Sequence, residues 1–386
     1  MFPTPADPTN GIFIYNRVKI LTKKVVEFRI IDPQPKYFPM SSLISEKYAV
    51  YRQIPKKFEI KGIPVSSPKY TYLPVKYFRN RIGKLITKSL LKQCEDLKKE
   101  NFSLIHAHGA IDAGVAAMNL SRKLGIPYLI TAHGSDVNLS FGNKVKENNL
   151  TDVLCNASKV IFVSEALREN AKKLDGYSGK NSVVISNGID TDLFKQMDRS
   201  VLRKKMNVPA ESKVILFVGN LLRIKGAHLL PKIFRGIKKE IPDSFFYIVG
   251  DGPLKKSMIE ELSNLNILGD TVFTGRVAQE EVPIYMNLSD VLVLPSLNEG
   301  QGAVILESLA CGTPVVGSDV GGIPETIGDE IYGKTFPVGN VDKAVEAILE
   351  VLSVNWDRKK LNERVLEFSW EKVVNSEIEV YNEIIN

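Results

Sequence analysis

The sequence predicts an α/β protein with two domains, each built on a parallel β-sheet. Three observations support this prediction. The chain has 386 residues, which is long for one hydrophobic core, so two domains of about 150–200 residues are expected. In both halves, short runs rich in β-branched residues alternate with amphipathic stretches at helical spacing, as in βαβ units. The alternation restarts after residues 198–212, a charged segment containing Pro209 that is the best candidate for a linker.

The expected elements follow these runs in chain order. The first half is expected to contain a helix at 114–124 and strands at 103–106, 127–131, 160–163 and 183–185. The second half repeats the pattern with strands at 213–218, 245–249, 291–294 and 314–316. Two such domains joined by a linker leave a cleft where the carboxyl ends of the strands meet. Ligands of these sheets usually bind there.

The composition is that of an ordinary globular protein, with 44% hydrophobic and 25% charged residues, which excludes a disordered chain. The three cysteines, Cys94, Cys155 and Cys311, are far apart, which fits a reduced cytosol better than a disulfide framework. The amino terminus has neither the basic region nor the apolar core of a secretory signal. No apolar run approaches the roughly 20 residues that span a bilayer. We therefore expect a soluble, cytoplasmic protein.

The net charge of +7 is unevenly distributed along the chain. Residues 1–200 hold 31 basic and 18 acidic side chains, and residues 51–100 alone hold 13 basic and 4 acidic ones. Within 76–100, apolar residues repeat at helical spacing with Lys and Arg between them. Two interpretations stay open: a helix packed on its sheet with solvated lysines, or a basic surface touching anionic lipid or a lipid-diphosphate acceptor. A basic face also suits nucleic acid, but no recognition motif accompanies it.

The segment that carries most chemistry runs from Pro295 to Glu307. A strand is expected to end at Pro295, a glycine-containing turn carries Glu299, and a helix begins near Gly302. Backbone N–H groups at such a helix start form a ready anion site, which suits a diphosphate. Glu307 lies about a turn and a half into that helix, so it can reach the same cleft as Glu299. Two carboxylates beside a phosphate site are suited to accept hydrogen bonds from sugar hydroxyls.

This segment resembles the E-x7-E signature of the retaining glycosyltransferases of glycosyltransferase family 4. The resemblance covers nearly the whole chain, and its motifs are highly specific when taken together. They are Phe2-Pro3 through Gly11-Ile-Phe, Thr131-Ala-His-Gly-Ser-Asp136, Val163-Ser-Glu165, Asn187-Gly-Ile-Asp190, Val218-Gly219 through Lys225-Gly226, Gly250-Asp-Gly-Pro253, and the E-x7-E block with Gly321-Gly-Ile-Pro-Glu325.

The resemblance implies the GT-B fold, in which two Rossmann-like domains face a central cleft. It implies an acceptor-side domain at 1–200 and a nucleotide-sugar domain at 201–368. The C-terminal helix at 369–386 is expected to pack back on the N-terminal domain. The family normally has a full β-strand before the segment that here begins at Phe2. We therefore expect either a truncated start or an N-terminal sheet that lacks this strand.

The resemblance also implies roles for single residues. Glu299 would contact the transferred sugar and Glu307 the ribose hydroxyls. Lys225 would bind the diphosphate and offset the charge that develops on the leaving group. The other implied positions are His133 near the sugar, Gly302 and Ala303 at the helix start, Gly11 in the first loop, and Arg223 in place of the arginine that the family often has at Asn220.

No metal or other cofactor is expected. Asp190 and Asp192 form a D-x-D pair, which metal-dependent transferases of another fold use to bind a cation, but a turn is the favoured interpretation. No His/Cys cluster has zinc spacing. Retention by double displacement would need a carboxylate nucleophile on the face opposite the leaving group. The resemblance implies instead a front-face substitution, with the donor phosphate drawing the acceptor proton.

The predicted function is transfer of a hexose-type sugar from a UDP-, GDP- or ADP-linked donor to a saccharide or lipid-linked acceptor, in cell-surface polysaccharide or glycolipid synthesis. Peripheral contact with an anionic membrane is a further expectation, and nucleic acid is not an expected partner. The alternatives are a GT-B phosphorylase or epimerase, which handles the same ligands, and a non-catalytic nucleotide-sugar-binding protein. A phosphorylase would need a further phosphate pocket, for which the second half shows no extra basic motif.

Overall fold

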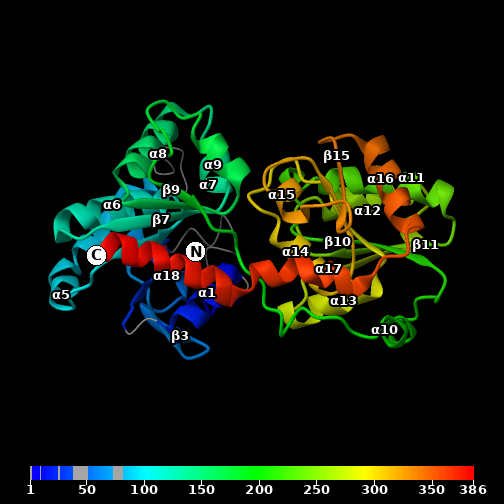
Figure 1. The fold of residues 1–386 in the computed structure, drawn as a ribbon, viewed down its shortest axis with the longest axis horizontal. Coiled ribbons are helices and arrows are strands. Elements are labelled where there is room, and N and C mark those ends of the chain that lie inside the picture. Colours follow the sequence, from blue (N-terminus) through cyan, green and yellow to red (C-terminus); the bar gives the residue numbers. More distant parts are fainter. Residues whose placement is uncertain (1, 9, 25–26, 38–50, 73–80) are drawn as a thin grey trace. The chain divides into compact units, whose positions relative to one another are not determined.

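The computed structural model describes residues 2–8, 10–24, 27–37, 51–72 and 81–386 (Figure 1). The chain divides into two compact units. The first comprises Met1–Ser186 with Trp370–Asn386, and the second comprises Asn187–Ser369. Each unit is built on a parallel sheet with helices packed against it, which confirms the predicted α/β class.

The second unit contains a six-stranded sheet in the order β12-β11-β10-β13-β14-β15, and all its strand pairs are parallel. Parallel strands buried on both faces use continuous apolar runs, and the four central strands were predicted from such runs. The two edge strands, β12 and β15, were not predicted, because their residues are only partly buried. The strands are β10 (Lys213–Val218), β11 (Ser244–Val249), β12 (Thr271–Gly275), β13 (Val291–Leu294), β14 (Val315–Ser318) and β15 (Gly333–Phe336).

Successive residues of these strands point to opposite faces and feed two separate cores. On β10, Ile215 and Phe217 join one core, whereas Val214 and Leu216 join the other. In Figure 1, α11, α12 and α16 lie on one side of the sheet, and α13 and α17 lie on the other. The helices are α10 (Arg199–Lys205), α11 (Leu230–Glu240), α12 (Lys255–Asn264), α13 (Val282–Leu288), α14 (Ala303–Ala310), α15 (Ile323–Ile327), α16 (Val341–Ser353) and α17 (Arg358–Val365).

The first unit contains a four-stranded parallel sheet in the order β6-β7-β8-β9. Helices α6, α8 and α9 cover one face, and α1 and α18 cover the other. The predicted strand at 103–106 lies two residues further along, because the strand begins only where pairing with β7 starts, at Ile105. The elements are α1 (Ile12–Leu21), β6 (Ile105–His108), α6 (Asp112–Leu124), β7 (Tyr128–Ala132), α7 (Ser135–Asn138), α8 (Lys144–Asn156), β8 (Lys159–Phe162), α9 (Glu165–Ala171), β9 (Ser182–Val184) and α18 (Trp370–Ile385).

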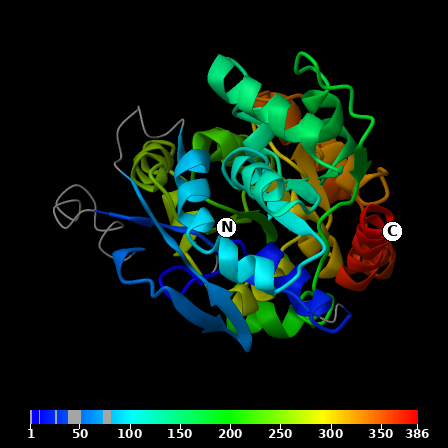
Figure 2. The ribbon, with the colours of Figure 1, turned by 90° about the vertical axis from the view of Figure 1, so that its left-hand side faces the viewer.

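Two smaller sheets precede the four-stranded one. Strand β1 (Ile30–Ile31) pairs with β4 (Ile63–Ser66), which forms a hairpin with β3 (Lys57–Ile60). Strand β2 (Gln34–Lys36) pairs with β5 (Lys69–Thr71). The hairpin lies below the cyan helices of the first unit in Figure 2. Among the described residues before α1, the chain forms an isolated bridge between Thr4 and Asp7 rather than a strand.

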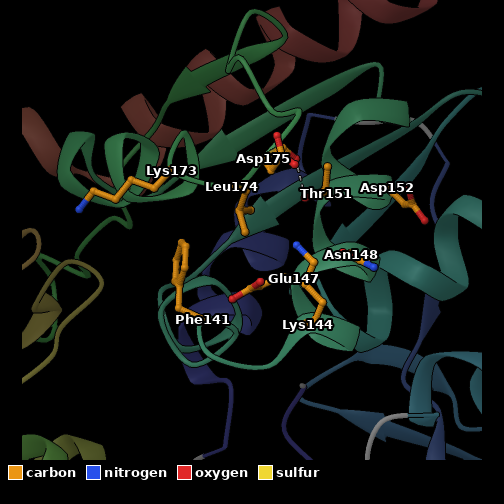
Figure 3. A pocket seen from close by; sticks show the side chains of 9 residues that line it. All are labelled: Phe141, Lys144, Glu147, Asn148, Thr151, Asp152, Lys173, Leu174 and Asp175. Carbon is orange, nitrogen blue, oxygen red and sulfur yellow. Dashed lines mark hydrogen bonds between the residues drawn. The ribbon is translucent and has the colours of Figure 1, made fainter.

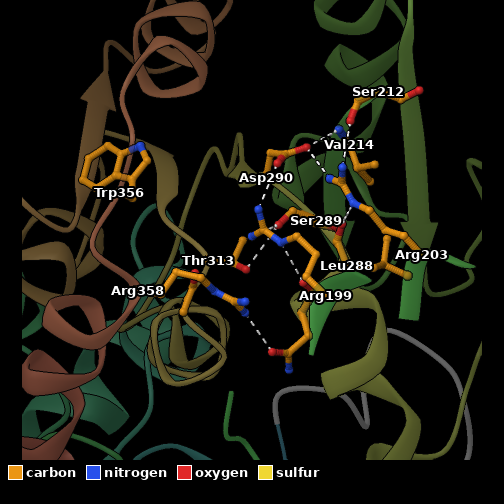
Figure 4. A network of polar contacts seen from close by, with 12 residues as sticks. Arg199, Arg203, Ser212, Val214, Leu288, Ser289, Asp290, Thr313, Trp356 and Arg358 are labelled. Carbon is orange, nitrogen blue, oxygen red and sulfur yellow. Dashed lines mark hydrogen bonds and ion pairs between the residues drawn. The ribbon is translucent and has the colours of Figure 1, made fainter. Parts of the chain in front are cut away.

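The predicted linker at 198–212 was wrong, because this segment is part of the second unit. It contains α10, whose Arg203 donates to Asp290 Oδ2 at 2.6 Å and to the Leu288 carbonyl at 2.9 Å (Figure 4). Arg199 binds the other carboxylate oxygen of Asp290 at 3.0 Å. The chain is therefore already bound to the second unit before residue 201, the boundary that the sequence predicted.

The C-terminal helix α18 runs beside α1 in the first unit (Figure 1). Arg17 of α1 and Glu377 of α18 are both fully buried, and Arg17 Nη1 lies 3.2 Å from Glu377 Oε1. The Arg17 guanidinium also lies over the Trp370 ring. Removing one partner of such a buried pair leaves an uncompensated charge, so loss of either side chain should strongly destabilise the packing of α18 on α1.

The basic segment forms α4 (Ile82–Leu91) and α5 (Cys94–Lys99), and its part at 76–80 lies outside the described residues. Ile86 and Leu90 of α4 pack in a core with residues of α6. The apolar face of α4 is therefore covered by protein, and its exposed face carries Lys84 and Lys88, with the exposed Lys92 as its C-cap. Within the described ranges, no helix has the length and apolar character needed to cross a bilayer.

Candidate active site

Loops from three neighbouring strands of the second unit meet around Glu299. The loop after β13 donates from the Leu297 N–H to the Ile224 carbonyl, in the loop after β10, at 2.9 Å. The loop after β14 donates from the Gly322 N–H to the Gly300 carbonyl at 3.1 Å. Because these strands are parallel, all three loops leave the same edge of the sheet, where ligands of such folds bind.

Two glycines allow the backbones of these loops to approach so closely. A Cβ atom at Gly226, whose φ is +68°, would lie 1.7 Å from the Pro295 carbonyl oxygen. A Cβ atom at Gly321, whose φ is +55°, would lie 1.9 Å from the Glu299 carbonyl oxygen. Any side chain at either position would push the loops apart, so these two glycines of the sequence motifs are required to form the site.

Lys225 and Glu299 form an ion pair in this structure. Lys225 Nζ lies 2.6 Å from Glu299 Oε2, and the lysine and glutamate side chains are 30% and 12% exposed. The Gly300 N–H donates to Glu299 Oε1 at 3.2 Å, and the Ser296 hydroxyl donates to Oε2 at 3.4 Å. The sequence predicted that Lys225 binds the diphosphate and Glu299 the sugar of one ligand. In the structure the two side chains are in direct contact.

Helix α14 begins beside this pair. Gly302 caps it in the left-handed conformation, with φ +85°, and its N-terminus has no side-chain cap. The first N–H groups of the helix, starting at Ala303, are therefore oriented for an anion. Glu307 lies in the second turn of α14, where burial raises the pKa of its carboxyl group to about 7. A carboxyl group with this pKa gains most from a ligand that donates hydrogen bonds to the ionised form.

Two of the residues predicted to bind the donor do not contact the Lys225–Glu299 pair. Arg223 and Asn220 both lie exposed in the loop after β10, where their backbone carbonyls accept from the Gly226 N–H at 2.9 Å and the Leu222 N–H at 2.8 Å. Gln301, by contrast, is a residue whose role the sequence did not indicate. It is 3% exposed and binds the Asn187 backbone with both ends of its amide, at 2.7 and 3.2 Å.

The D-x-D pair forms a turn, as the sequence predicted. Asp190 Oδ1 accepts from the backbone N–H groups of Asp192 and Leu193, each at 3.1 Å. This is an Asx-type turn, in which one carboxylate oxygen is already used by the local backbone.

His133 and Gly11 lie in the first unit. His133 follows β7, and its Nε2 lies 3.2 Å from Nδ1 of His108 at the end of β6. The two imidazole rings are nearly parallel, and the Phe13 ring of α1 packs against His133 on another side. Gly11 caps α1 in the left-handed conformation, with φ +71° and no side-chain cap.

A third histidine extends this row. His106 Nε2 lies 2.7 Å from the Thr131 hydroxyl, and its Nδ1 lies 2.8 Å from the Tyr381 hydroxyl and 3.2 Å from Glu377 Oε1. Burial lowers the pKa of His106 to about 4 and lowers the pKa values of His108 and His133 well below the usual value. The three rings are therefore neutral at physiological pH.

His106, His108 and Glu377 could hold a metal ion by proximity, since their ligand atoms lie within 4.8 Å of one another. The sequence did not indicate this group, because Glu377 is remote from the histidines along the chain. Both nitrogens of His106 already have hydrogen-bond partners, and the Arg17 guanidinium lies against the same Glu377 oxygen that faces His106. A divalent cation would have to displace these contacts and approach a fixed positive charge, so the geometry favours a hydrogen-bonded network.

A cavity of about 360 Å³ lies elsewhere in the first unit, around α8 and the end of α9 (Figure 3). It is lined by the Phe141 ring and by side chains of both charge signs, among them Lys144, Glu147 and Asp175. Glu147 is already engaged, because its carboxylate accepts from the Gly142 N–H at 2.8 Å. None of the residues that the sequence predicted for the site lines this cavity.

Comparison with known proteins identifies the family. Residues 198–367 match the family model described as Glycosyl transferases group 1, and residues 55–193 match the one described as Glycosyltransferase Family 4. The chain is 30% identical to the "Putative teichuronic acid biosynthesis glycosyltransferase TuaC" of Bacillus subtilis, over 92% of this chain and 86% of that protein. The chain belongs to glycosyltransferase family 4. This family-4 chain is therefore a glycosyltransferase, as the sequence predicted.

Other relatives of this glycosyltransferase act in different syntheses. The chain is 28% identical to the N-acetyl-alpha-D-glucosaminyl L-malate synthase of Bacillus anthracis, over 76% of this chain and 78% of that protein. It is also 28% identical to the alpha-monoglucosyldiacylglycerol synthase of Streptococcus pneumoniae, over 77% of this chain and 70% of that protein. Polysaccharide and glycolipid synthesis are thus both represented among its relatives.

Solved structures confirm the predicted GT-B fold. A sucrose-phosphate synthase of Thermosynechococcus elongatus superposes with a TM-score of 0.76 at 23% identity, over 96% of this chain and 92% of that chain. Anabaena Alr3699/HepE, solved in complex with UDP, superposes with a TM-score of 0.74 at 19% identity, over 99% and 98% of the two chains. At these identities the likeness extends to the fold alone.

Proposed function

We propose that this glycosyltransferase moves a hexose-type sugar from a nucleotide-sugar donor to a saccharide or lipid-linked acceptor, with retention of configuration at the anomeric carbon. The observation that carries the proposal is the Lys225–Glu299 ion pair beside the N-terminus of α14. It brings together a cation, uncapped N–H donors and a carboxylate, which are the groups that a sugar diphosphate requires.

In this proposal the donor replaces the internal ion pair. The diphosphate binds Lys225 and the N–H groups that begin at Gly302 and Ala303. Glu299, released from Lys225, accepts hydrogen bonds from the sugar hydroxyls. Glu307 accepts from the ribose, which supplies donors to a carboxyl group that is otherwise costly to ionise in its partly buried position. UDP-sugars are the first donors to test, because structural neighbours were solved with UDP and UDP-glucose. GDP- and ADP-sugars complete the set.

The proposed reaction is a front-face substitution. The bond between the anomeric carbon and the phosphate oxygen breaks, the acceptor oxygen bonds to the same face of that carbon, and the acceptor proton passes to the departing phosphate oxygen. Lys225 stabilises the negative charge that grows on the diphosphate, a role for which preorganised charges are the main catalytic means. No metal takes part in this proposal, because Lys225 and the α14 N-terminus supply the positive potential. In the first unit, His133 contacts the sugar, and Gly11 allows close approach of the donor phosphate or the acceptor.

The proposed location is the cytoplasm, with peripheral contact to anionic membrane. Three cysteines are free, as expected in a reducing compartment. Lys84 and Lys88 of α4 and its C-cap residue Lys92 form one exposed row at a spacing of four residues, where like charges repel by a few tenths of a kcal/mol each. A partner of negative charge would offset this repulsion. Since the apolar face of α4 is covered by α6, the contact is electrostatic rather than an insertion of the helix.

The test begins with thermal-shift screening against UDP-, GDP- and ADP-sugars, since a ligand that binds only the folded state raises its stability. The selected donor is then incubated without acceptor, and release of the nucleoside diphosphate is measured for the wild type and for Glu299→Ala. We expect slow hydrolysis by the wild type and at least about a hundredfold loss in the variant. Donor binding without any turnover, with acceptor or without, would instead indicate a nucleotide-sugar-binding protein.

A further inference from the structure

The loop that carries His133 is held by one carboxylate, that of Asp136. Asp136 Oδ1 accepts from the N–H groups of His133 at 3.1 Å, Gly134 at 2.9 Å and Val137 at 3.2 Å. Its other oxygen, Oδ2, accepts from the Ala110 N–H at 2.8 Å. An ionised carboxylate has about four acceptor positions, so this side chain is nearly saturated by backbone donors.

These donors belong to loops of two different strands. Strands β6 and β7 are parallel neighbours with His108 paired to Thr131, so their following loops leave the same edge side by side. Asp136 joins the loop after β6, at Ala110, to the loop after β7, at His133. Gly134 has φ +123° and ψ −66°, a conformation that glycine adopts most easily. Gly134 and Asp136 of the His-Gly-Ser-Asp motif thus both fix the conformation of this loop, one through its backbone angles and the other through its hydrogen bonds.

The His133 side chain is held from the β6 side as well. His108 is on β6 directly before the loop that Asp136 binds, and its Nδ1 lies 3.2 Å from His133 Nε2. The orientation of His133 therefore depends on two contacts with β6 and its loop: the link through Asp136 to Ala110, and the ring contact with His108. The Gly109 N–H also donates to the Thr131 carbonyl at 2.9 Å, so loss of the Ala110 link should loosen the two loops beyond this bond and change the ring contact rather than separate the strands.

We propose that Asp136 is a positioning residue for His133, which it holds in the orientation used for the sugar by tying the loops after β6 and β7 together. The proposal rests on the role of His133 given under the proposed function. Asp136 itself touches no substrate in this account. Its carboxylate is engaged by the backbone, and burial raises its pKa while the N–H groups of Ala110, Gly134 and His133 act in the opposite direction.

The two substitutions of Asp136 have different expected effects. Asp136→Ala removes all the acceptors. Asp136→Asn keeps one oxygen for His133, Gly134 and Val137 but turns an NH₂ group toward the Ala110 N–H, so that two donors face each other and only the link between the loops is lost. We expect kcat to fall in both, by about a hundredfold for Asp136→Ala and less for Asp136→Asn, as for a misplacement of about 1 Å. The Kd for UDP should stay unchanged, because Lys225, Glu299 and Glu307 belong to the second unit.

The direct readout is the NMR spectrum of the protein labelled with ¹⁵N only at histidine. The chain contains four histidines in all. In Asp136→Ala the backbone amide resonance of His133 should shift strongly, whereas that of His228, in the second unit, serves as the internal reference. In Asp136→Asn the His133 amide should stay near its wild-type position while its ring resonances move. Asp152→Asn, an exposed aspartate of α8, is the matched control and should change neither spectrum nor kcat.

An unchanged His133 amide in Asp136→Ala, or an unchanged kcat in both variants, would overturn the proposal. If Asp136→Ala does not fold, Asp136→Asn carries the test through its ring resonances and kcat. If the wild type transfers no sugar from any donor, the proposed function fails, but the spectra still decide whether Asp136 positions His133.

Discussion

The candidate sites of the two units are built in opposite ways. In the second unit, charged side chains meet at the surface of three glycine-containing loops, and Lys225 and Glu299 remain partly exposed. In the first unit, neutral histidines lie in a row whose charged neighbours, Arg17 and Glu377, are fully buried. The difference indicates a division of work: the second unit is suited to bind an anion, and the first to orient a group without adding charge.

The largest effect is expected for Lys225→Ala. The variant loses the cation proposed for the diphosphate and leaves the Glu299 carboxylate without its ion-pair partner. We expect kcat/KM to fall about a thousandfold, which is the upper range for loss of one group that stabilises developing charge. Lys232→Ala, an exposed lysine of α11, is the matched control. A loss of less than about fivefold in steady-state kinetics would show that the second unit does not bind the donor through Lys225.

Glu307→Gln is expected to make the protein more stable but to weaken its binding of the donor. The pKa of Glu307 rises from its ordinary 4.5 to about 7 in the folded state. Between these values the unfolded state releases the proton while the folded state keeps it, so the free energy of unfolding falls as pH rises and levels off above pH 7. The glutamine variant avoids this cost and should be more stable than the wild type at pH 8 by up to about 3 kcal/mol.

Chemical denaturation at pH 4 and pH 8 measures this difference, which should be close to zero at pH 4. The same variant should bind the donor several-fold more weakly, since a neutral amide accepts fewer hydrogen bonds from a ribose. Equal stability of the two proteins at pH 8 would contradict the assignment of a partly buried, costly carboxylate to the donor site.

The smallest effect is expected on the surface of the first unit. Replacing Lys84, Lys88 and Lys92 together by glutamine should weaken sedimentation with vesicles containing anionic lipid, by about 1 kcal/mol per lysine at low salt. Hydrolysis of the donor should not change, because the substitutions lie in another unit from Lys225 and Glu299. Wild-type binding that is independent of anionic lipid and of salt would refute the membrane contact.

The contrast between the two units also explains how much of the fold and of the candidate site could be predicted from the sequence. The strands at 213–218 and 291–294 were predicted with their observed bounds, because continuous apolar runs mark strands buried on both faces. The Asx turn at Asp190 and the helix start at Gly302 are local features, and both were predicted correctly. The ion pair between Lys225 and Glu299 was not foreseen, although both residues were selected, because a pattern of residue types does not define which side chains touch.

The features that the sequence did not predict depend on contacts between segments that are far apart along the chain. The segment at 198–212 is charged like a linker, but Arg199 and Arg203 bind Asp290 almost a hundred residues later. The links from Asp136 to Ala110, and from His106 to Glu377, likewise join residues that only the folded sheet brings together. Gln301 was given no role because its partner is a backbone amide, for which a sequence carries no signal.

Calorimetric titration of UDP and of the selected sugar donor into the wild type and Glu299→Gln shows directly whether the donor displaces Glu299 from Lys225. If the donor replaces Glu299 at Lys225, the variant should bind UDP up to about fivefold more tightly, because no carboxylate competes for the lysine. The same variant should bind the sugar donor more weakly than the wild type, because the sugar loses its carboxylate acceptor. Changes of the same sign for the two ligands would contradict the account.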